Sequence, residues 1–412
     1  MKNDAYAALR FPEFVMLITG TFLNTAALLM QEIILGYELY KLTHNPLTLG
    51  LVGLAEALPY ISLALFGGHY ADRKDKRTIM KVSLSVIIFG SVILTWATLP
   101  DTKAQLGTQG LLWIIYSVLC LIGFAKGFYS PATSSLKAFL TSREAYANAS
   151  SWSSTFWQAG AILGPAIAGF LYYAFGLTNT LVIVIGLLLI NLLLISLISK
   201  KPIPVSAETT TNLWESIQEG ISFVFENKIM LYSISLDLVA VLFGGVIAIL
   251  PVFAEDILHV GPRELGILRA APSVGAVLTI VGSAYYSPVN RAWRNMIIAV
   301  SGFGIATLVF SISTHFWLSV AMLFLTGAFD SISVVIRQTI LQVIPPDNMR
   351  GRVIAVNSIF VSSSNEIGAF ESGLAASLLG TVPSVLAGGV VTMLVVAWVY
   401  AKSKDLLDVK LV

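Results

Sequence analysis

The chain has 412 residues, of which 56% are hydrophobic and only 12% are charged, a balance that excludes an ordinary soluble domain. The formal net charge of +2 gives no indication of a nucleic-acid partner. The single cysteine, Cys120, leaves neither a disulfide nor a thiolate metal site available. We therefore expect a membrane protein that binds no metal, no cofactor and no nucleic acid.

Twelve apolar stretches follow one another along the chain. Each is long enough to cross a hydrocarbon layer of about 30 Å as a helix of about 20 residues. Continuous apolar runs of this length exclude the alternating strands of a membrane β-barrel. We therefore predict an all-α membrane protein with twelve transmembrane helices. The spans are placed at residues 14–40, 47–66, 79–99, 111–137, 147–175, 178–199, 229–257, 264–286, 295–313, 317–344, 350–378 and 382–401.

The distribution of Lys and Arg predicts how these spans are oriented. If both termini lie inside, the inner segments hold most of the 25 basic residues, whereas the outer loops hold only Lys41, Lys103 and Arg263. We therefore expect a multi-pass protein with both termini in the cytoplasm.

The chain also repeats itself at low identity. Residues 113–176 align without a gap with residues 317–380, and the matched glycines include Gly123 with Gly327, Gly164 with Gly368, and Gly169 with Gly373. At a second offset, Pro46, Leu49 and Gly50 align with Pro262, Leu265 and Gly266. Closely packed membrane helices need small residues at fixed depths, so the glycines carry this match. Two tandem, similar halves are typical of transporters that rock one half against the other around a central site.

The repeat divides the chain into a first six-helix half at 1–199, a cytoplasmic linker at 200–228 and a second half at 229–412. Within the linker, residues 213–225 have the pattern of an amphipathic helix lying on the inner surface. No G-x-x-x-x-G-K-[ST] phosphate loop is present, so an ATP-driven pump is disfavoured. We expect the energy for transport to come from a gradient.

The loop after the second span reads G-H-Y-A-D-R-K-D-K-R over residues 68–77. It resembles the G-x-x-x-D-[RK]-x-G-[RK]-[RK] signature of the major facilitator superfamily, with Asp75 in place of the usual glycine. An acidic side chain at a helix end can meet the positive N-terminus of another helix. The alternative is a basic loop that only fixes topology. The resemblance implies a conformational latch formed by Gly68, Asp72, Arg73 and Arg77.

The fifth span reads G-A-I-L-G-P-A-I-A-G over residues 160–169. It resembles the g-x-x-x-G-P-x-x-G-G antiporter signature of drug-exporting members of that superfamily, with Ala168 in place of one glycine. The matching residues are Gly160, Gly164, Pro165 and Gly169. The match favours export. The alternative is tight helix packing with no bearing on direction.

Residues 327–373 resemble the branch of the superfamily that contains enterobactin exporters and macrolide efflux proteins. The resemblance implies proton-coupled export of a siderophore-like or drug-like small molecule across a bacterial inner membrane, by a monomer that works through alternating access. An importer or a lysophospholipid flippase of the same superfamily is the alternative. A membrane enzyme or a channel is disfavoured, because neither clustered metal ligands nor a catalytic triad nor a symmetric pore lining is found.

Ionisable side chains inside the spans are the candidates for binding protons and substrate, because burying a charge is expensive without a cavity, a partner or a proton. The resemblance implies that the first, fourth, seventh and tenth spans line the cavity. Lys126 and Asp330 occupy equivalent repeat positions with opposite charge, so we predict that they pair, with Arg337 as the alternative partner of Asp330. The candidate cavity residues are Asn24, Gln31, Glu32, Glu56, Lys126, Asp237, Asp330, Arg337 and Glu366.

Overall fold

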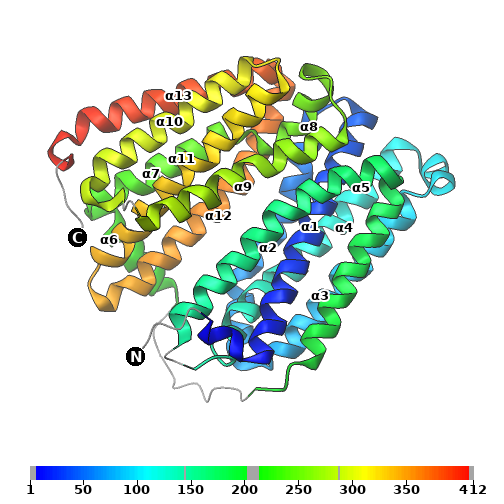
Figure 1. Ribbon diagram of the computed structural model, residues 1–412, viewed down its shortest axis with the longest axis horizontal. Coiled ribbons are helices and arrows are strands. Elements are labelled where there is room, and N and C mark those ends of the chain that lie inside the picture. The colour runs from blue at the N-terminus through cyan, green and yellow to red at the C-terminus, as the bar shows by residue number, and fades with distance from the viewer. Residues whose placement is uncertain (1–5, 143–144, 202–212, 286–287, 408–412) are drawn as a thin grey trace. The chain divides into compact units, whose positions relative to one another are not determined.

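The computed structural model describes residues 6–142, 145–201, 213–285 and 288–407, and the regular elements within them are helical (Figure 1). The all-α class predicted from the sequence is confirmed. The helices are α1 (Pro12–Thr43), α2 (Pro46–Arg73), α3 (Lys76–Ala97), α4 (Pro100–Lys137), α5 (Tyr146–Leu197), α6 (Leu213–Glu226), α7 (Lys228–Gly244), α8 (Leu250–Val252), α9 (Pro262–Tyr285), α10 (Ala292–Ile312), α11 (Phe316–Val343), α12 (Asp347–Leu379) and α13 (Thr381–Lys402).

Among the described residues, ten helices are long and apolar enough to cross a membrane. One of them, α5, runs through both the fifth and the sixth predicted spans. Gly176 interrupts its helical backbone with a φ of 75°, a conformation that glycine adopts without strain. In α12 only a shorter apolar segment, Ile367–Leu379, is recognised. The count of twelve spans therefore stays a prediction.

The chain folds as two compact units. The first unit comprises Met1–His44, Leu51–Glu208 and Val260–Ala270, and the second comprises Asn45–Gly50, Thr209–His259 and Ala271–Val412. The division into halves at 1–199 and 229–412 stays a prediction, because these units have other bounds. The first turn of α2 groups with the second unit, and the first turns of α9 group with the first unit.

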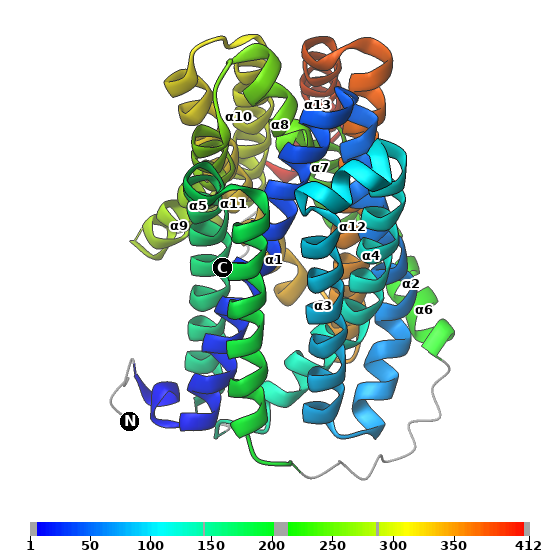
Figure 2. The ribbon, with the colours of Figure 1, turned by 90° about the vertical axis from the view of Figure 1, so that its right-hand side faces the viewer.

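In the first unit, α1 packs along α5, and α3 lies beside α4 (Figure 2). Helix α1 begins with Pro12, whose fixed φ suits the first helical position, and it ends at His44 in the left-handed region at φ 47°. Its buried face includes Phe14, Ile18 and Ile34, which join one apolar core with residues of α3, α4 and α5. In a bilayer, such packing is stabilised by van der Waals contact between the helices rather than by removal of apolar surface from water.

In the second unit, α10 packs between α11 and α13, and α7 packs against α12 and α13 (Figure 1). The span that starts with α7 is broken at Gly245, where the backbone leaves the helix. The hydroxyl of Ser372 on α12 donates a hydrogen bond of 2.8 Å to the Gly245 carbonyl. A neighbouring side chain thus satisfies a backbone group that the break releases, as an apolar environment requires.

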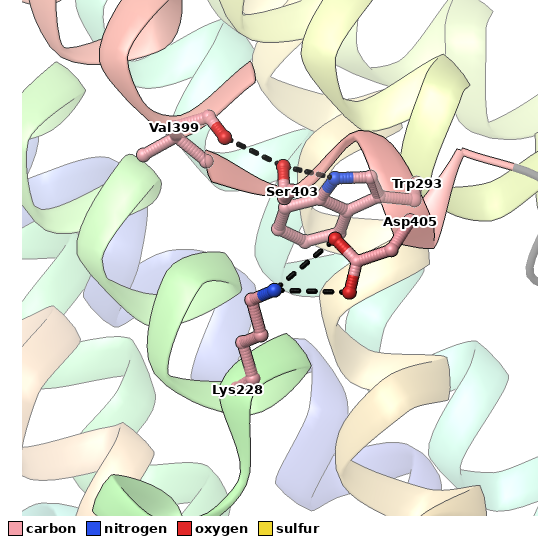
Figure 3. A network of polar contacts seen from close by, with 5 residues as sticks. All are labelled: Lys228, Trp293, Val399, Ser403 and Asp405. Carbon is pink, nitrogen blue, oxygen red and sulfur yellow. Dashed lines mark hydrogen bonds and ion pairs between the residues drawn. The ribbon is translucent and has the colours of Figure 1, made fainter. Parts of the chain in front are cut away.

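The start of α7 and the start of α10 are both fastened near the end of α13 (Figure 3). The Lys228 ammonium lies 2.9 Å and 3.1 Å from the two carboxylate oxygens of Asp405. The buried indole of Trp293 donates to Ser403 over 2.8 Å, and Ser403 donates in turn to the Val399 carbonyl over 2.6 Å.

The hydrogen bond from Lys228 lowers the pKa of the Asp405 carboxyl below its ordinary value. A carboxyl pKa that is lower in the folded state adds stability above the unfolded-state value and loses it as the pH falls through the lowered value. Because the pair is solvent-exposed, this contribution is small.

The amphipathic helix predicted at 213–225 is present as α6, and the described part of its apolar face packs on protein. Val224 is buried, and Ile221 packs against the same core in the second unit. A Cβ added at Gly220 would come within 3.1 Å of the Arg352 carbonyl oxygen on α12, and the Arg352 guanidinium pairs with Glu219. The adjoining linker residues 202–212 lie outside the described part of the chain.

Candidate functional site

Two helix crossings confirm the internal repeat at the level of packing. A Cβ added at Gly123 on α4 would collide with the carbonyl oxygen of Glu56 on α2. A Cβ added at Gly327 on α11 would collide in the same way with the carbonyl oxygen of Pro272 on α9. Gly123 aligns with Gly327 at the first offset, and Glu56 aligns with Pro272 at the second. The two offsets therefore describe the same helix crossing, present once in each half. Glycine is needed at both crossings because the helix backbones touch there.

A second pair of crossings involves the exchanged first turns of α2 and α9. Within the second unit, a Cβ at Gly373 on α12 would lie 2.8 Å from the Cα of Gly50 on α2. Within the first unit, a Cβ at Gly266 on α9 would lie 2.8 Å from the Pro165 carbonyl oxygen and 3.2 Å from the Cα of Gly169 on α5. These contacts are again equivalent under the repeat.

The motif that resembles the antiporter signature forms these close contacts. A Cβ at Gly160 would lie 2.8 Å from the Phe22 carbonyl oxygen, and one at Gly164 would lie 2.8 Å from that of Ala26, both on α1. At Gly169 the motif meets α9. The motif therefore allows α5 to approach α1 and α9 closely. This role in helix packing is the alternative interpretation of the motif given above.

An ion pair joins α1 to the first turns of α9 inside the first unit. Arg269 Nη2 donates to Glu32 Oε1 over 2.8 Å, and the Glu32 side chain remains 47% exposed. A cation–π contact also holds the first turn of α9: the Arg263 guanidinium lies 4.9 Å from the centre of the Phe170 ring on α5. Glu32 therefore combines access to solvent with a cationic partner on another helix.

Thr21, Asn24 and Gln31 recur on α1 with Glu32 at helical spacing, and we call these four residues the α1 stripe. The other three face different neighbours. Gln31 is buried and accepts a hydrogen bond of 2.8 Å from Ser91 on α3, so it joins helices rather than facing an open space. Thr21 turns back to donate to the Leu17 carbonyl of its own helix. Among the described residues, the buried Oδ1 atom of Asn24 has no hydrogen-bond partner. Asn24 and Glu32 are thus the two members of the stripe that retain polar groups for another molecule.

The ammonium of Lys126 on α4 pairs with the carboxylate of Glu56 on α2, directly beside the Gly123 crossing. Both side chains are partly exposed. Two of the predicted cavity residues are therefore brought together, although the sequence did not pair them. The predicted pairing of Lys126 with Asp330 stays a prediction.

The guanidinium of Arg337 on α11 pairs with Asp237 on α7, and the two side chains are only 3% and 5% exposed. The sequence had suggested Asp330 as the alternative partner of Arg337. Asp330 lies two turns, about 10 Å, away along the same helix, whereas α7 packs directly against α11. Arg337 therefore pairs with Asp237 on a neighbouring helix rather than with Asp330 on its own helix.

Asp330 keeps its carboxylate without an ion pair or hydrogen bond among the described residues. One turn further along the same face, the hydroxyl of Ser333 is buried and also has no hydrogen-bond partner in the described structure. This stretch of α11 therefore presents an unpaired charge next to an unsatisfied polar atom.

A polar group that was not predicted from the sequence lies near the C-terminal end of α1. Glu38 accepts from Lys103 over 2.5 Å and from the Tyr172 hydroxyl over 2.5 Å, and so ties α1 to α4 and α5. The available signal was an acidic residue in the last turns of the first span together with a basic residue in an outer loop. Since it links three helices, we interpret the cluster as structural.

Several predicted residues lie outside what the structure describes. These are the side chains of Gly68, Asp72 and Arg73 in the proposed latch, and that of Glu366 on α12. Arg77, the last latch residue, donates through Nη2 to the Ser196 carbonyl on α5. The latch itself therefore stays a prediction from the motif.

Comparison with known proteins places this arrangement in a family. The model of the Major Facilitator Superfamily matches residues 14–369. The multidrug efflux pump Tap of Mycolicibacterium fortuitum is 24% identical over 368 residues, which cover 86% of this chain and 87% of that protein. The enterobactin exporter EntS of Shigella boydii serotype 18 is 24% identical over 385 residues, which cover 92% and 88%.

Solved structures agree on the fold. A bacterial homologue of the human lysosomal transporter Spinster, in an inward-facing and unoccupied conformation, has a TM-score of 0.73 at 16% identity and covers 96% of this chain and 98% of its own. A variant of the nucleoside transporter NupG has a TM-score of 0.76 at 12% identity, with 94% and 99% covered. With the family model matched over most of the chain and the fold shared throughout, the chain belongs to the Major Facilitator Superfamily and is a transporter rather than an enzyme.

Proposed function

We propose that the chain exports an organic small molecule from the bacterial cytoplasm across the inner membrane, by alternating access coupled to proton entry. The relatives support the direction, since one is named a multidrug efflux pump and the other an enterobactin exporter. The excess of Lys and Arg in the loops assigned to the inside supports an orientation with both termini in the cytoplasm. We expect a monomer to suffice, because each repeat supplies half of one carrier.

The observation that carries the coupling proposal is the ion pair of Glu32 and Arg269. An antiporter must change its conformation when it carries cargo or a proton, and must not do so when it carries neither. An ion pair present only in the empty, deprotonated carrier meets this requirement. Protonation of Glu32 removes one charge of the pair, and a bound cargo that competes for the carboxylate has the same effect.

The geometry connects this pair to a conformational change. The first turns of α9 rest on α1 and α5 through Arg269, through Arg263 on the Phe170 ring, and through the backbone contact of Gly266 with Pro165. Two of these contacts do not depend on the charge of Glu32. Loss of the ion pair therefore weakens the packing of α9 on α1 and α5 without abolishing it. Such a contact suits a reversible switch whose states differ by a few kcal/mol.

Other charged groups around Glu32 are few. Helix α5, which packs along α1, contains no Asp, Glu, Lys or Arg between Tyr146 and Leu197. On the first turns of α9 the ionisable residues besides Arg269 are Arg263 and Glu264. Arg263 is engaged with an aromatic ring, so Arg269 is the cation to which we assign control of Glu32.

Inverted membrane vesicles test the proposal. With the wild-type chain, addition of cargo should release protons from acidified vesicles, and a protonophore should abolish cargo accumulation. Arg269→Gln should lower accumulation against a gradient while leaving or raising the rate of downhill flux, because the empty carrier is no longer locked. Arg263→Gln is the matched control on the same helix and should retain accumulation. Accumulation that survives the protonophore and follows a sodium gradient would disprove proton coupling.

A further inference from the structure

The charges inside the spans are unevenly satisfied, and the imbalance bears on what the carrier transports. Away from the ends of the predicted spans the sequence places three cations, and the structure pairs each of them with a carboxylate. Arg269 pairs with Glu32, Lys126 with Glu56, and Arg337 with Asp237. An anionic cargo would therefore have to displace a carboxylate from one of these cations before it could bind there.

The carboxylates are in excess. After the three pairs are formed, the described part of the spans, away from their ends, still contains Asp330 on α11 and Glu371 on α12 without an ion-pair partner. Asp330 lies near the middle of its span, whereas Glu371 lies beside the Gly373 crossing, where the backbones of α12 and α2 touch. Of the two, Asp330 is the one with a buried hydroxyl one turn away, that of Ser333, which has no hydrogen-bond partner in the described structure.

The surroundings of Asp330 indicate a ligand rather than a structural partner. Ser333, one turn away on the same face, is 3% exposed and its hydroxyl has no hydrogen-bond partner among the described residues. Buried polar atoms are nearly always satisfied, and an exception at a candidate site points to a group that binds there. An unpaired carboxylate beside an unsatisfied hydroxyl suits a cationic group, such as an ammonium, that can also interact with the hydroxyl oxygen.

We propose that Asp330 recognises a positive charge on the cargo, so that the exported molecule is a lipophilic cation. The inference rests on the proposed export function and narrows its cargo: it favours a cationic drug-like molecule over an anionic siderophore-like one. A carboxylate inside a span is costly unless it is neutralised, and a cationic cargo neutralises it. The apolar remainder of the cargo matches the apolar composition of the spans.

Two probes of the same size and shape but opposite charge test this directly. Tetraphenylphosphonium and tetraphenylborate are measured by equilibrium binding to the purified full chain in detergent. The wild type should bind the cation more tightly than the anion. Asp330→Asn should weaken cation binding at least about tenfold and leave or improve anion binding. Equal binding of both probes, or cation binding unchanged in Asp330→Asn, would overturn the proposal.

Two further variants keep the result interpretable. Asp330→Glu retains the charge and should keep most of the affinity for the cation, which separates loss of charge from loss of folding. Glu371→Gln removes the other unpaired carboxylate and should retain cation binding. If Glu371→Gln lost cation binding while Asp330→Asn retained it, Glu371 rather than Asp330 would recognise the cation, and the proposal would be rejected.

The failure of this inference differs from the failure of the proposed function. If inverted vesicles accumulate anionic compounds and not cations, export stands and the inference falls. If purified protein binds tetraphenylphosphonium through Asp330 but vesicles accumulate no compound against a gradient, recognition stands and the export proposal falls.

Discussion

Replacing Arg337 with methionine leaves the carboxylate of Asp237 inside the second unit without its ion-pair partner. The two side chains are 3% and 5% exposed, so water screens neither of them. Removing one member of a buried pair typically costs about 3–5 kcal/mol, because the remaining charge has lost both its hydration and its partner. We expect the single variants Arg337→Met and Asp237→Leu each to lower the free energy of unfolding by an amount in this range. The arginine variant should lie nearer its upper end.

The double variant Asp237→Leu/Arg337→Met should be far less damaging than the sum of the two changes. Replacing a whole buried pair by apolar residues of similar volume is often neutral or even stabilising by about 1–4 kcal/mol. The assay is thermal and denaturant unfolding of the purified chain in one detergent, analysed as a double-mutant cycle. The coupling energy should reach several kcal/mol.

The matched control is the second Arg–carboxylate pair of the same unit. Arg352 and Glu219 are 31% and 55% exposed, so their coupling should stay below about 1 kcal/mol. Strict additivity for Asp237 and Arg337, or equal coupling in the buried and the exposed pair, would refute the reasoning that burial sets the magnitude.

Three further outcomes follow from the motif and from the packing. Asp72→Asn should slow transport by reconstituted protein while leaving it folded, because the latch loses its charge; normal rates would remove the latch. Gly327→Ala should destabilise the chain by about 1–3 kcal/mol because its Cβ meets backbone, whereas Gly282→Ala, with open space around it, should not. Ser403→Ala should cost about 1–3 kcal/mol in thermal unfolding by leaving the buried Trp293 N–H without an acceptor; an unchanged melting curve would argue against that hydrogen bond.

The sequence predicted the elements of this fold well because hydrophobic runs and small residues act locally. The aligned glycines are a clear case: Gly123 and Gly327 occupy equivalent crossings because close backbone contact tolerates no larger side chain. Glu32 could likewise be singled out as an acid inside an apolar span. The break in the helical backbone at Gly176 falls between the predicted fifth and sixth spans, so only the boundary between them differs from the prediction.

The partners of the charged residues could not be predicted in the same way. Lys126 and Asp330 matched in the repeat, yet the carboxylate placed against Lys126 is Glu56 on α2, and the alignment of α2 with α9 does not indicate which side chain faces Lys126. Which residue faces a given charge depends on the rotation and neighbours of each helix, and these are set by the packing of the whole unit. Linker helix α6 illustrates the same limit, since its apolar pattern is equally suited to a membrane surface and to the protein core that it covers.

The most direct test of coupled export is the accumulation ratio of tetraphenylphosphonium in proteoliposomes at zero membrane potential, measured as a function of an imposed pH gradient. With wild-type protein, the ratio should rise above equilibrium in proportion to the gradient and collapse with a protonophore. With Glu32→Gln, which carries no titratable group at the coupling position, the cation should equilibrate without accumulating. Once the purified chain has been shown to bind tetraphenylphosphonium, a ratio that never exceeds equilibrium in the wild type, or that Glu32→Gln leaves unchanged, would contradict proton-coupled export through this residue.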